Sequence, residues 1–414
     1  MGTVFHLFRF CILVALVVLN SACARLSFSN TSKALQSLNS LPSSLPTGLP
    51  NFPFPGPSPS PKSPVTPSAV STNGFAGGNA VRIPFGIAWV YPMSMAVQSD
   101  GKIIYVGGTG GEESQLQIAR YNADGTIDTS FGKGGMTVSN YGTNSYLNGV
   151  AIQSDGKIVA SGDSGSGEAI LIRYNSDGTV DSTFAVVVMQ NSAFLHPAIQ
   201  LNGQILVSTG TSIYRFNSDG TADAKFGNSG NISAMGAFAL QANQQIVYFA
   251  NGQATLGRAN ADGSIDSTFN AALPSSASTS IDDALAIQSD GKIVVGGDVV
   301  GTAGSSYYVA RYNPDGTADA KFGSNGVFLG SYGGQGLAGW GNLTNLVVLA
   351  NGNIFGAGIS GTFELNANGS ADSSYVDKIG YMACALPAAA AGPGSYVYVN
   401  LACSGGGTIY QVTP

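Results

Sequence analysis

Hydrophobic and polar positions after residue 80 recur in one unit that is repeated along the chain. The unit has a first segment, AVQSDGKIIYVGG at Ala96–Gly108, and a second, ARYNADGTIDTSFG at Ala119–Gly132, each with apolar residues on both sides of an Asp-Gly pair. The turn glycine of the second segment returns at intervals of 42 to 53 residues, at Gly125, Gly178, Gly220, Gly263, Gly316 and Gly369. Repeats of this length predict the blades of a propeller or the coils of a solenoid.

Each unit divides into four short runs that are rich in β-forming residues. In one unit the runs are Met136–Tyr141, Leu147–Gln153, Lys157–Ser161 and Ala169–Asn175. An Asp-Gly pair between two such runs predicts a tight hairpin, because Gly tolerates a positive φ. A propeller blade requires four strands joined by tight turns, and a lone sheet would leave both faces in water, so the blades must stack.

The number of copies predicts a closed ring. The third run of the unit is found seven times, at Ile103, Ile158, Ile205, Ile246, Ile293, Ile354 and Tyr396–Val399. The last copy has no outermost strand, whereas Val81–Phe85 aligns with the outer strands and has no blade of its own. We therefore predict an all-β, seven-bladed β-propeller of four-stranded blades over residues 79–414, closed by its N-terminal strand, which removes the open sheet edge.

The first residues predict export. The apolar run Phe10–Leu19 has the length of a signal-peptide core and is too short for a permanent membrane helix, so we assign residues 1–22 to a signal peptide. The sequence LNSAC, which ends at Cys23, resembles a bacterial lipobox and predicts lipidation of that cysteine, although Asn20 takes a position that is usually apolar. The alternative is ordinary cleavage after Ala24.

Residues 23–78 predict a stalk. They are rich in proline and serine and show no sustained hydrophobic period, a composition that favours extended, disordered chain and cannot bury a core. A lipid on Cys23 would anchor this stalk to a membrane. We expect an outer-membrane or cell-surface lipoprotein, with a periplasmic or secreted protein as the alternative.

Composition narrows the classes of partner. The formal net charge is −6 and only 10% of residues are charged, so the chain lacks the clustered Lys and Arg of a nucleic-acid surface. The 57 glycines and the low charge suit an extracytoplasmic all-β protein. Cys384 and Cys403 both fall in the last blade, and an oxidising compartment would allow them to form a disulfide. We expect a monomeric propeller.

The repeat resembles the bacterial delta-sixty repeat family of surface and cell-wall-associated proteins. The likeness covers residues 81–414 and rests on the motifs Q-S-D-G-K-I and R-Y-N-x-D-G-T-x-D-x-x-F. The resemblance implies a propeller fold and a location at the cell surface. It implies no reaction.

The motif N-x-D-G-[TS]-x-D raises the question of calcium. Asn122, Asp124 and Asp128 supply three oxygen-bearing side chains at a calcium-like spacing, but the further ligands and the terminal Glu of an EF-hand loop are missing. A tight hairpin in which Asn and Asp cap backbone amides fits better, because the motif recurs in six blades. We therefore expect no cofactor, with calcium at this motif as the alternative.

Five arginines each precede an aspartate by eight residues: Arg120, Arg173, Arg215, Arg258 and Arg311. This spacing predicts an Arg–carboxylate pair inside each blade. The alternative is a ring of guanidinium groups that binds anions. One copy carries Glu364 in place of the arginine, so the pair must differ there.

The loops on one face of the disc vary in length. Strand direction alternates, so both families of Asp-Gly turn fall on one face and the remaining connections share the other. Variable loops on a rigid scaffold are common binding sites. The aromatic residues and histidine of this face are Trp89, Tyr91, Tyr141, Tyr146, Phe194, His196, Tyr332 and Trp340. We predict that Trp89, Tyr91, Tyr146, His196, Tyr332 and Trp340 bind an extracellular glycan, peptide or envelope protein, with plugging of the channel mouth as the alternative.

Catalytic chemistry has little support. His196 is the only histidine outside the leader, so neither a triad with a second histidine nor a multi-histidine metal site can be built. Asp163 and Asp298 end equivalent strands of the second and fifth blades, and with Asp282 or Asp283 they could form the carboxylate pair of a glycoside-cleaving enzyme. We predict a binding or scaffold module, with a glycan-directed hydrolase or lyase as the alternative.

Overall fold

The computed structural model describes residues 81–82, 94–109, 114–142, 144–165, 167–190, 194–250, 254–275, 277, 284–299, 306–331, 343–358, 361–377, 388–392, 396–403 and 406–412. These residues belong to one compact unit, Val65–Pro414. They form β-strands and turns and include no helix. Accordingly, none of the described segments is a helix long and apolar enough to cross a membrane.

The strands form seven antiparallel sheets, which we number as blades 1 to 7 in chain order. Blade 1 contains β2 (Ser94–Val97), β3 (Ile103–Gly108), β4 (Leu116–Tyr121) and β5 (Met136–Ser139). Blade 2 contains β6 (Tyr146–Ile152), β7 (Ile158–Asp163), β8 (Glu168–Tyr174) and β9 (Val187–Gln190). Blade 3 contains β10 (Pro197–Ile199), β11 (Ile205–Ser208), β12 (Ser212–Phe216) and β13 (Asn231–Ser233).

The remaining blades follow the same plan. Blade 4 contains β14 (Met235–Leu240), β15 (Ile246–Phe249), β16 (Thr255–Ala259) and β17 (Ala271–Ala272). Blade 5 contains β18 (Ala284–Ile287), β19 (Ile293–Asp298), β20 (Ser306–Tyr312) and β21 (Val327–Ser331). The described part of blade 6 contains β22 (Leu343–Val348), β23 (Ile354–Gly358) and β24 (Gly361–Leu365). Blade 7 contains β25 (Ala388–Ala391), β26 (Val397–Cys403), β27 (Gly406–Val412) and β1 (Val81–Arg82).

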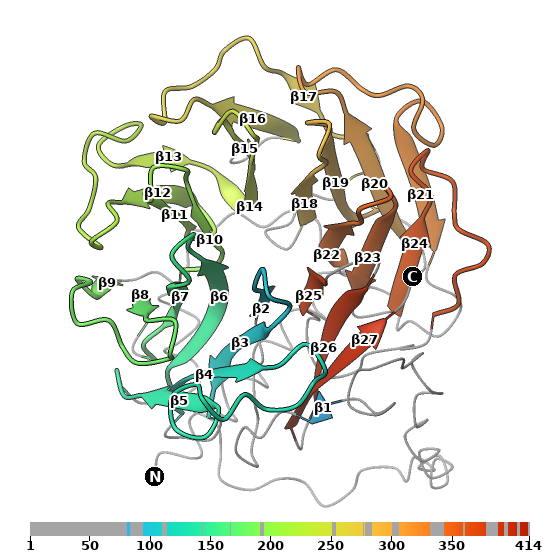
Figure 1. Cartoon of the computed structure of the whole chain (residues 1–414). Helices are drawn as coiled ribbons and strands as arrows, with labels where there is room; N and C mark the ends of the chain where they lie inside the picture. The colour runs from blue at the N-terminus through green and yellow to red at the C-terminus, as the bar shows by residue number, and fades with distance from the viewer. Residues whose placement is uncertain are drawn as a thin grey trace, which may run out of the picture. The chain divides into compact units, whose positions relative to one another are not determined.

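The blades close into a ring, as the sequence predicted. Successive sheets contact one another in chain order, and β2 of blade 1 contacts both β6 of blade 2 and β25 of blade 7 (Figure 1). The closing strand β1 lies antiparallel to β27, with Val81 opposite Ile409 and Arg82 opposite Thr408. The predicted seven-bladed propeller is therefore confirmed, and so is the pairing of its two ends within one sheet.

The repeat of the sequence and the blade of the structure are offset by one strand. The run that begins at Met136 pairs with β4 of the preceding blade, where Met136 lies opposite Ala119. Each repeat therefore supplies the outer strand of one blade and the three inner strands of the next. This offset links neighbouring blades covalently at the rim of the ring.

The hydrophobic core lies between the sheets. In the second strand of blade 1, Ile103 to Val106 have no exposed surface, because neighbouring blades cover both faces of the sheet. The outer strands face solvent on one side, so Val138 and Leu329 remain 48% and 60% exposed. Stacked sheets thus bury the continuous apolar runs of the inner strands, which a single sheet could not do.

Candidate functional site

The Asn and Asp side chains of the repeated turn hold the turn itself. In blade 1, Asn122 Nδ2 donates to Thr126 Oγ1 at 3.0 Å, and Asp124 Oδ1 accepts hydrogen bonds from the hydroxyl and the backbone N–H of Thr126. These bonds lower the pKa of Asp124. Gly125 has a φ of 84°, which a residue with a side chain rarely adopts. The motif therefore builds a tight hairpin, which the sequence favoured over a calcium site.

The third candidate calcium ligand, Asp128, binds two cationic side chains. Its Oδ2 lies 2.7 Å from Arg120 Nε and 3.0 Å from Lys102 Nζ. Burial opposes ionisation of Asp128, but hydrogen bonds from Ser130, Lys102 and Arg120 outweigh it and hold the pKa well below its usual range. Nowhere in the described part of the chain do three or more His, Cys, Asp or Glu side chains gather as a metal site would require.

The predicted Arg–carboxylate pair is present in five blades. The Nε–Oδ2 distances are 2.7–2.9 Å in the pairs Arg120–Asp128, Arg173–Asp181, Arg215–Asp223, Arg258–Asp266 and Arg311–Asp319. All ten side chains are largely buried. The guanidinium groups are therefore committed to internal pairs, which argues against the alternative of an anion-binding ring.

Each of these arginines also reaches the next blade, which the sequence did not predict. Arg173 Nη1 donates to the backbone carbonyl of Ser218 at 2.5 Å, and its guanidinium carbon lies 4.7 Å from the centre of the Phe184 ring. The same two contacts recur for the other four arginines. We call this set of contacts the arginine latch. It fastens one blade to the following one at five seams.

Blade 6 departs from this pattern. Glu364 takes the place of the latch arginine and is only 4% exposed. Its Oε1 accepts a hydrogen bond from Asn353 Nδ2 at 2.7 Å, whereas its Oε2 has no hydrogen-bond partner. Burial raises the pKa of this carboxyl, and the negative charge of Asp372 raises it further. A single buried glutamate thus stands in blade 6 where blades 1 to 5 have an Arg–Asp pair.

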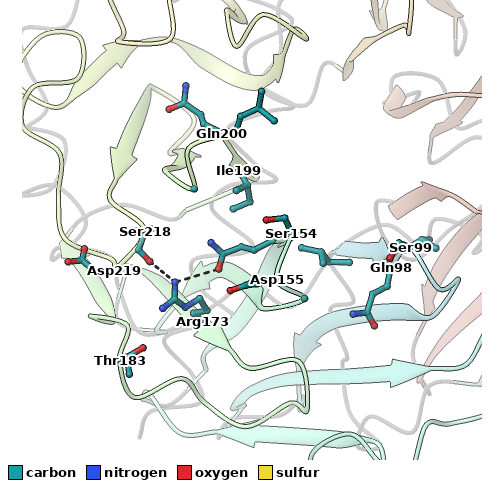
Figure 2. Close-up of a pocket in the computed structure, with 16 residues that line it drawn as sticks. Gln98, Ser99, Ser154, Asp155, Arg173, Thr183, Ile199, Gln200, Ser218 and Asp219 are labelled. Carbon is teal, nitrogen blue, oxygen red and sulfur yellow. Dashed lines mark hydrogen bonds between the residues drawn. The ribbon is translucent and has the colours of Figure 1, made fainter.

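A cavity in the described part of the molecule lies on the face of the Asp-Gly turns (Figure 2). It has a volume of about 940 Å³ and is bordered by the same turn of three successive blades, at Gln98–Ser99, Gln153–Gly156 and Gln200–Gly203. Ser218 and Asp219, from the second turn family, also line it. Both turn families therefore meet on one face, as the alternation of strands predicted. We call this cavity the turn-face pocket.

Hydrogen-bonding groups dominate the turn-face pocket. The side chains of Gln98 and Gln153 and the hydroxyls of serines line it, and Ile152 and Ile199 add apolar surface. The amide of Gln200 is buried and bonded to the carbonyl of Ala261 and to Arg215. Figure 2 shows Arg173 at one wall, where it donates to the carbonyl of Ser218 and, at 3.5 Å, to the side-chain oxygen of Gln153. The latch therefore holds this wall in place. Side chains with both donor and acceptor atoms suit a ligand that offers both as well.

Negatively charged side chains outnumber positively charged ones at the pocket. Asp181 lies outside the lining and pairs with both Arg173 and Lys157, whereas Asp155 and Asp219 both line the cavity, so three carboxylates stand against two cations. Hydrogen bonds from Thr221 lower the pKa of Asp219, so it is ionised at neutral pH. The pocket therefore presents a net negative charge to a ligand.

Most of the residues that the sequence assigned to binding lie outside the described residues. These are Trp89, Tyr91, Tyr332 and Trp340, together with Asp282, Asp283, the lipidation candidate Cys23 and the disulfide candidate Cys384. Cys403 ends β26, and its side chain is likewise not described. The predictions for these positions stay predictions.

The described members of that set belong to two neighbouring blades. Tyr146 begins β6 and is partly buried, whereas His196 precedes β10 of the next blade and is solvent-accessible, although the protein around it lowers its pKa by desolvation. Phe194, expected among the loop aromatics, is fully buried and packs edge-on against Phe216 with ring centres 5.7 Å apart. Tyr141 packs against the core between blades 1 and 2. For Phe194 and Tyr141, packing is the observed role.

The two described candidates for a carboxylate pair belong to separate blades. Asp163 ends β7 in blade 2, where it accepts a hydrogen bond from the backbone N–H of Gly165 at 2.5 Å. Asp298 ends β19 in blade 5, where it accepts one from Leu343 at 3.4 Å. Blades 3 and 4 separate them along the ring. Each carboxylate thus accepts a hydrogen bond from a backbone N–H at a strand end.

Comparison with known proteins agrees with the fold. A protein-family profile described as "Domain of unknown function (DUF5122) beta-propeller" matches residues 98–131, 153–184 and 288–322. The chain is a β-propeller repeat protein. A search of curated proteins found no match.

Solved structures of similar fold have low sequence identity to this propeller. A streptogramin B lyase is 13% identical with a TM-score of 0.51, over 80% of this chain and 97% of that one. A catalytically inactive virginiamycin B lyase from Staphylococcus aureus, with quinupristin, is 12% identical with a TM-score of 0.52, over 80% and 98%. YCF48 bound to D1 peptide is 13% identical with a TM-score of 0.50, over 84% and 99%. At these identities the likeness shows the fold alone.

Proposed function

We propose that this propeller is a non-covalent binding module of the cell envelope and that its ligand occupies the turn-face pocket. The observation that carries the proposal is the construction of the pocket. The same turn of blades 1, 2 and 3 surrounds a cavity of about 940 Å³, which is the size of a typical site for a small ligand or a short chain segment.

The lining of the pocket favours binding over catalysis. The cationic group in its wall, Arg173, is held by Asp181 and by the carbonyl of Ser218, so it serves as a fixed part of the scaffold. The remaining amides and hydroxyls are groups that orient a ligand through hydrogen bonds. Propellers of similar fold include one with quinupristin and one bound to D1 peptide, which supports ligand binding as a use of this architecture. A glycan, a peptide or an envelope protein fits this role.

The location in the envelope rests on the leader. The signal peptide expected at residues 1–22 would export the chain, and lipidation of Cys23 would tether it through the Pro/Ser-rich segment. A tethered propeller at the surface would act as a receptor or scaffold. Loss of membrane association in a Cys23→Ser variant would support this location, and retention of membrane association would contradict it.

A matched pair of substitutions tests the pocket. Ser154 lies in the turn of blade 2 and lines the cavity, whereas Ser289 is the exposed equivalent in blade 5 and lies outside it. In a screen of oligosaccharide and peptide panels by fluorescence anisotropy, Ser154→Trp should abolish binding by filling the pocket. Ser289→Trp should leave binding unchanged. Equal binding by both variants, or no binding to either panel by the wild-type protein, would refute the proposal.

A further inference from the structure

One turn at the edge of the turn-face pocket carries an unusual residue. The turn of blade 3 reads Gln-Leu-Asn-Gly, and Leu201 occupies a position that holds Ser99, Ser154, Ala242, Ser289 or Ala350 in the equivalent turns. Leu201 is 84% exposed, more than any other large hydrophobic side chain among the described residues. It also lines the pocket. A Leu fully exposed on a turn offers an apolar surface that the fold itself does not use.

A side chain of the next blade fixes this turn. Gln244 accepts a hydrogen bond at its Oε1 from the backbone N–H of Leu201, at 2.8 Å. Gln244 itself has a φ of 69°, in the left-handed region, whereas the equivalent turns have Gly101, Gly156, Gly203, Gly291 and Gly352. A residue other than glycine is strained in this conformation. Blade 4 thus carries a strained residue whose side chain reaches back to hold Leu201.

We propose that the ligand of the turn-face pocket is a peptide segment with an apolar side chain that packs on Leu201 and a basic side chain that pairs with Asp155 or Asp219. This inference rests on the proposed function and names its ligand class. The hydrogen bond from Gln244 fixes the backbone of the turn at Leu201 before binding, which reduces the entropy cost of binding a ligand there. The apolar contact and the charge of the pocket each match one side chain of such a peptide.

Two features of the pocket favour a peptide over a neutral glycan. The lining contains aliphatic side chains, Ile152, Ile199 and Leu201, but none of the aromatic rings on which sugars pack. Two carboxylates line the pocket, and they outweigh the single positive charge that is left where Asp181 pairs with both Arg173 and Lys157, so the pocket attracts a cation. Binding of a glycan in place of a peptide is therefore an alternative outcome of the experiment that follows.

Selection from a phage-displayed library of random peptides on the immobilised full-length protein tests the inference. The enriched peptides should combine an apolar residue with Lys or Arg. Their affinity, measured by fluorescence anisotropy, should fall about tenfold in Leu201→Ser, because one central apolar contact is lost. Leu201→Met should retain most of the affinity. Gln244→Gly should weaken binding several-fold while preserving or increasing thermal stability, because it releases the turn and removes the strained residue.

The outcomes separate this inference from the proposed function. Enriched peptides that bind Leu201→Ser as tightly as the wild-type protein would overturn the inference. Failure to enrich peptides over the Ser154→Trp variant would also overturn it. If oligosaccharides bind and Ser154→Trp blocks them, the binding module stands and the peptide class fails. If neither panel binds, both proposals fail.

Discussion

The arginine latch makes a quantitative prediction for Arg311→Met. Arg311 Nε lies 2.8 Å from Asp319 Oδ2, its Nη1 donates to the carbonyl of Ala367 in blade 6 at 2.5 Å, and its guanidinium carbon lies 4.5 Å from the centre of the Phe322 ring. Both members of the ion pair have side chains that are 7% exposed. Methionine fills much of the same volume but supplies neither the charge nor the hydrogen bonds.

The expected loss follows from the state of Asp319 in the variant. Removing one partner of a buried ion pair costs about 3–5 kcal/mol, because the other charge is left uncompensated. Lys292 Nζ remains 3.5 Å from Asp319 Oδ2, so the lower end of that range applies. We therefore expect the free energy of unfolding to fall by about 3 kcal/mol, which for a chain of this size lowers Tm by about 5 °C.

Lys292→Met is the matched control. It removes a positive charge from the same carboxylate oxygen, but the lysine side chain is 30% exposed and makes no contact of the latch type. An exposed ion pair contributes about 1 kcal/mol or less. Urea unfolding followed by intrinsic fluorescence would measure both variants. Equal losses in the two variants, or a loss below about 1 kcal/mol for Arg311→Met, would refute the idea that the buried latch carries the stability.

Two further predictions concern the buried acid and one turn. Glu364→Gln keeps the acceptor for Asn353 but removes a carboxyl whose pKa is raised by burial, so the variant should be more stable than the wild type at pH 7. Because the raised pKa penalises only the ionised form, this gain in stability should disappear near pH 4. Urea unfolding that shows the same gain at both pH values would contradict the prediction. Gly316→Ala would place a Cβ 2.8 Å from the Phe269 ring at a φ of 94°, so it should lower the free energy of unfolding by about 3 kcal/mol, measured by calorimetry. Gly203→Ala is the control and should cost about 1 kcal/mol, because its Cβ would meet its nearest atom at 3.6 Å. Comparable Tm values for the two variants would contradict the role of packing at the seam.

The sequence predicted the features that depend on local spacing. Asp-Gly pairs demand a positive φ, and the structure has φ of 84° at Gly125 and 89° at Gly178. The interval of eight residues between Arg120 and Asp128 spans one hairpin, so register brings the two side chains together whatever the rest of the fold does. The count of third strands predicted the ring, and the strand at Val81 without a blade predicted its closure, because the last copy of the unit lacked an outer strand.

The features that depend on contacts across a seam could not be predicted. The carbonyl that Arg173 reaches belongs to Ser218, and nothing in the intervening sequence marks that atom. The turn-face pocket is lined by turns of three blades, so it depends on how those blades are placed beside one another. Two signals pointed toward it without being recognised: Leu201 in a turn that otherwise carries Ser or Ala, and Gln244 where the other copies have Gly.

The pairing of β1 with β27 has a consequence for the order of folding. Val81 pairs with Ile409, and 409 − 81 gives a separation of 328 residues, so this contact closes the whole ring. Bringing such distant ends together from an unfolded chain costs about 5 kcal/mol of entropy by the logarithmic loop-closure relation. The contacts of two residue pairs offset little of that entropy cost unless the intervening blades have already assembled and brought the two ends close. The strand that is synthesised first is therefore the last to join its sheet, and until then the growing propeller exposes an unpaired edge at each end.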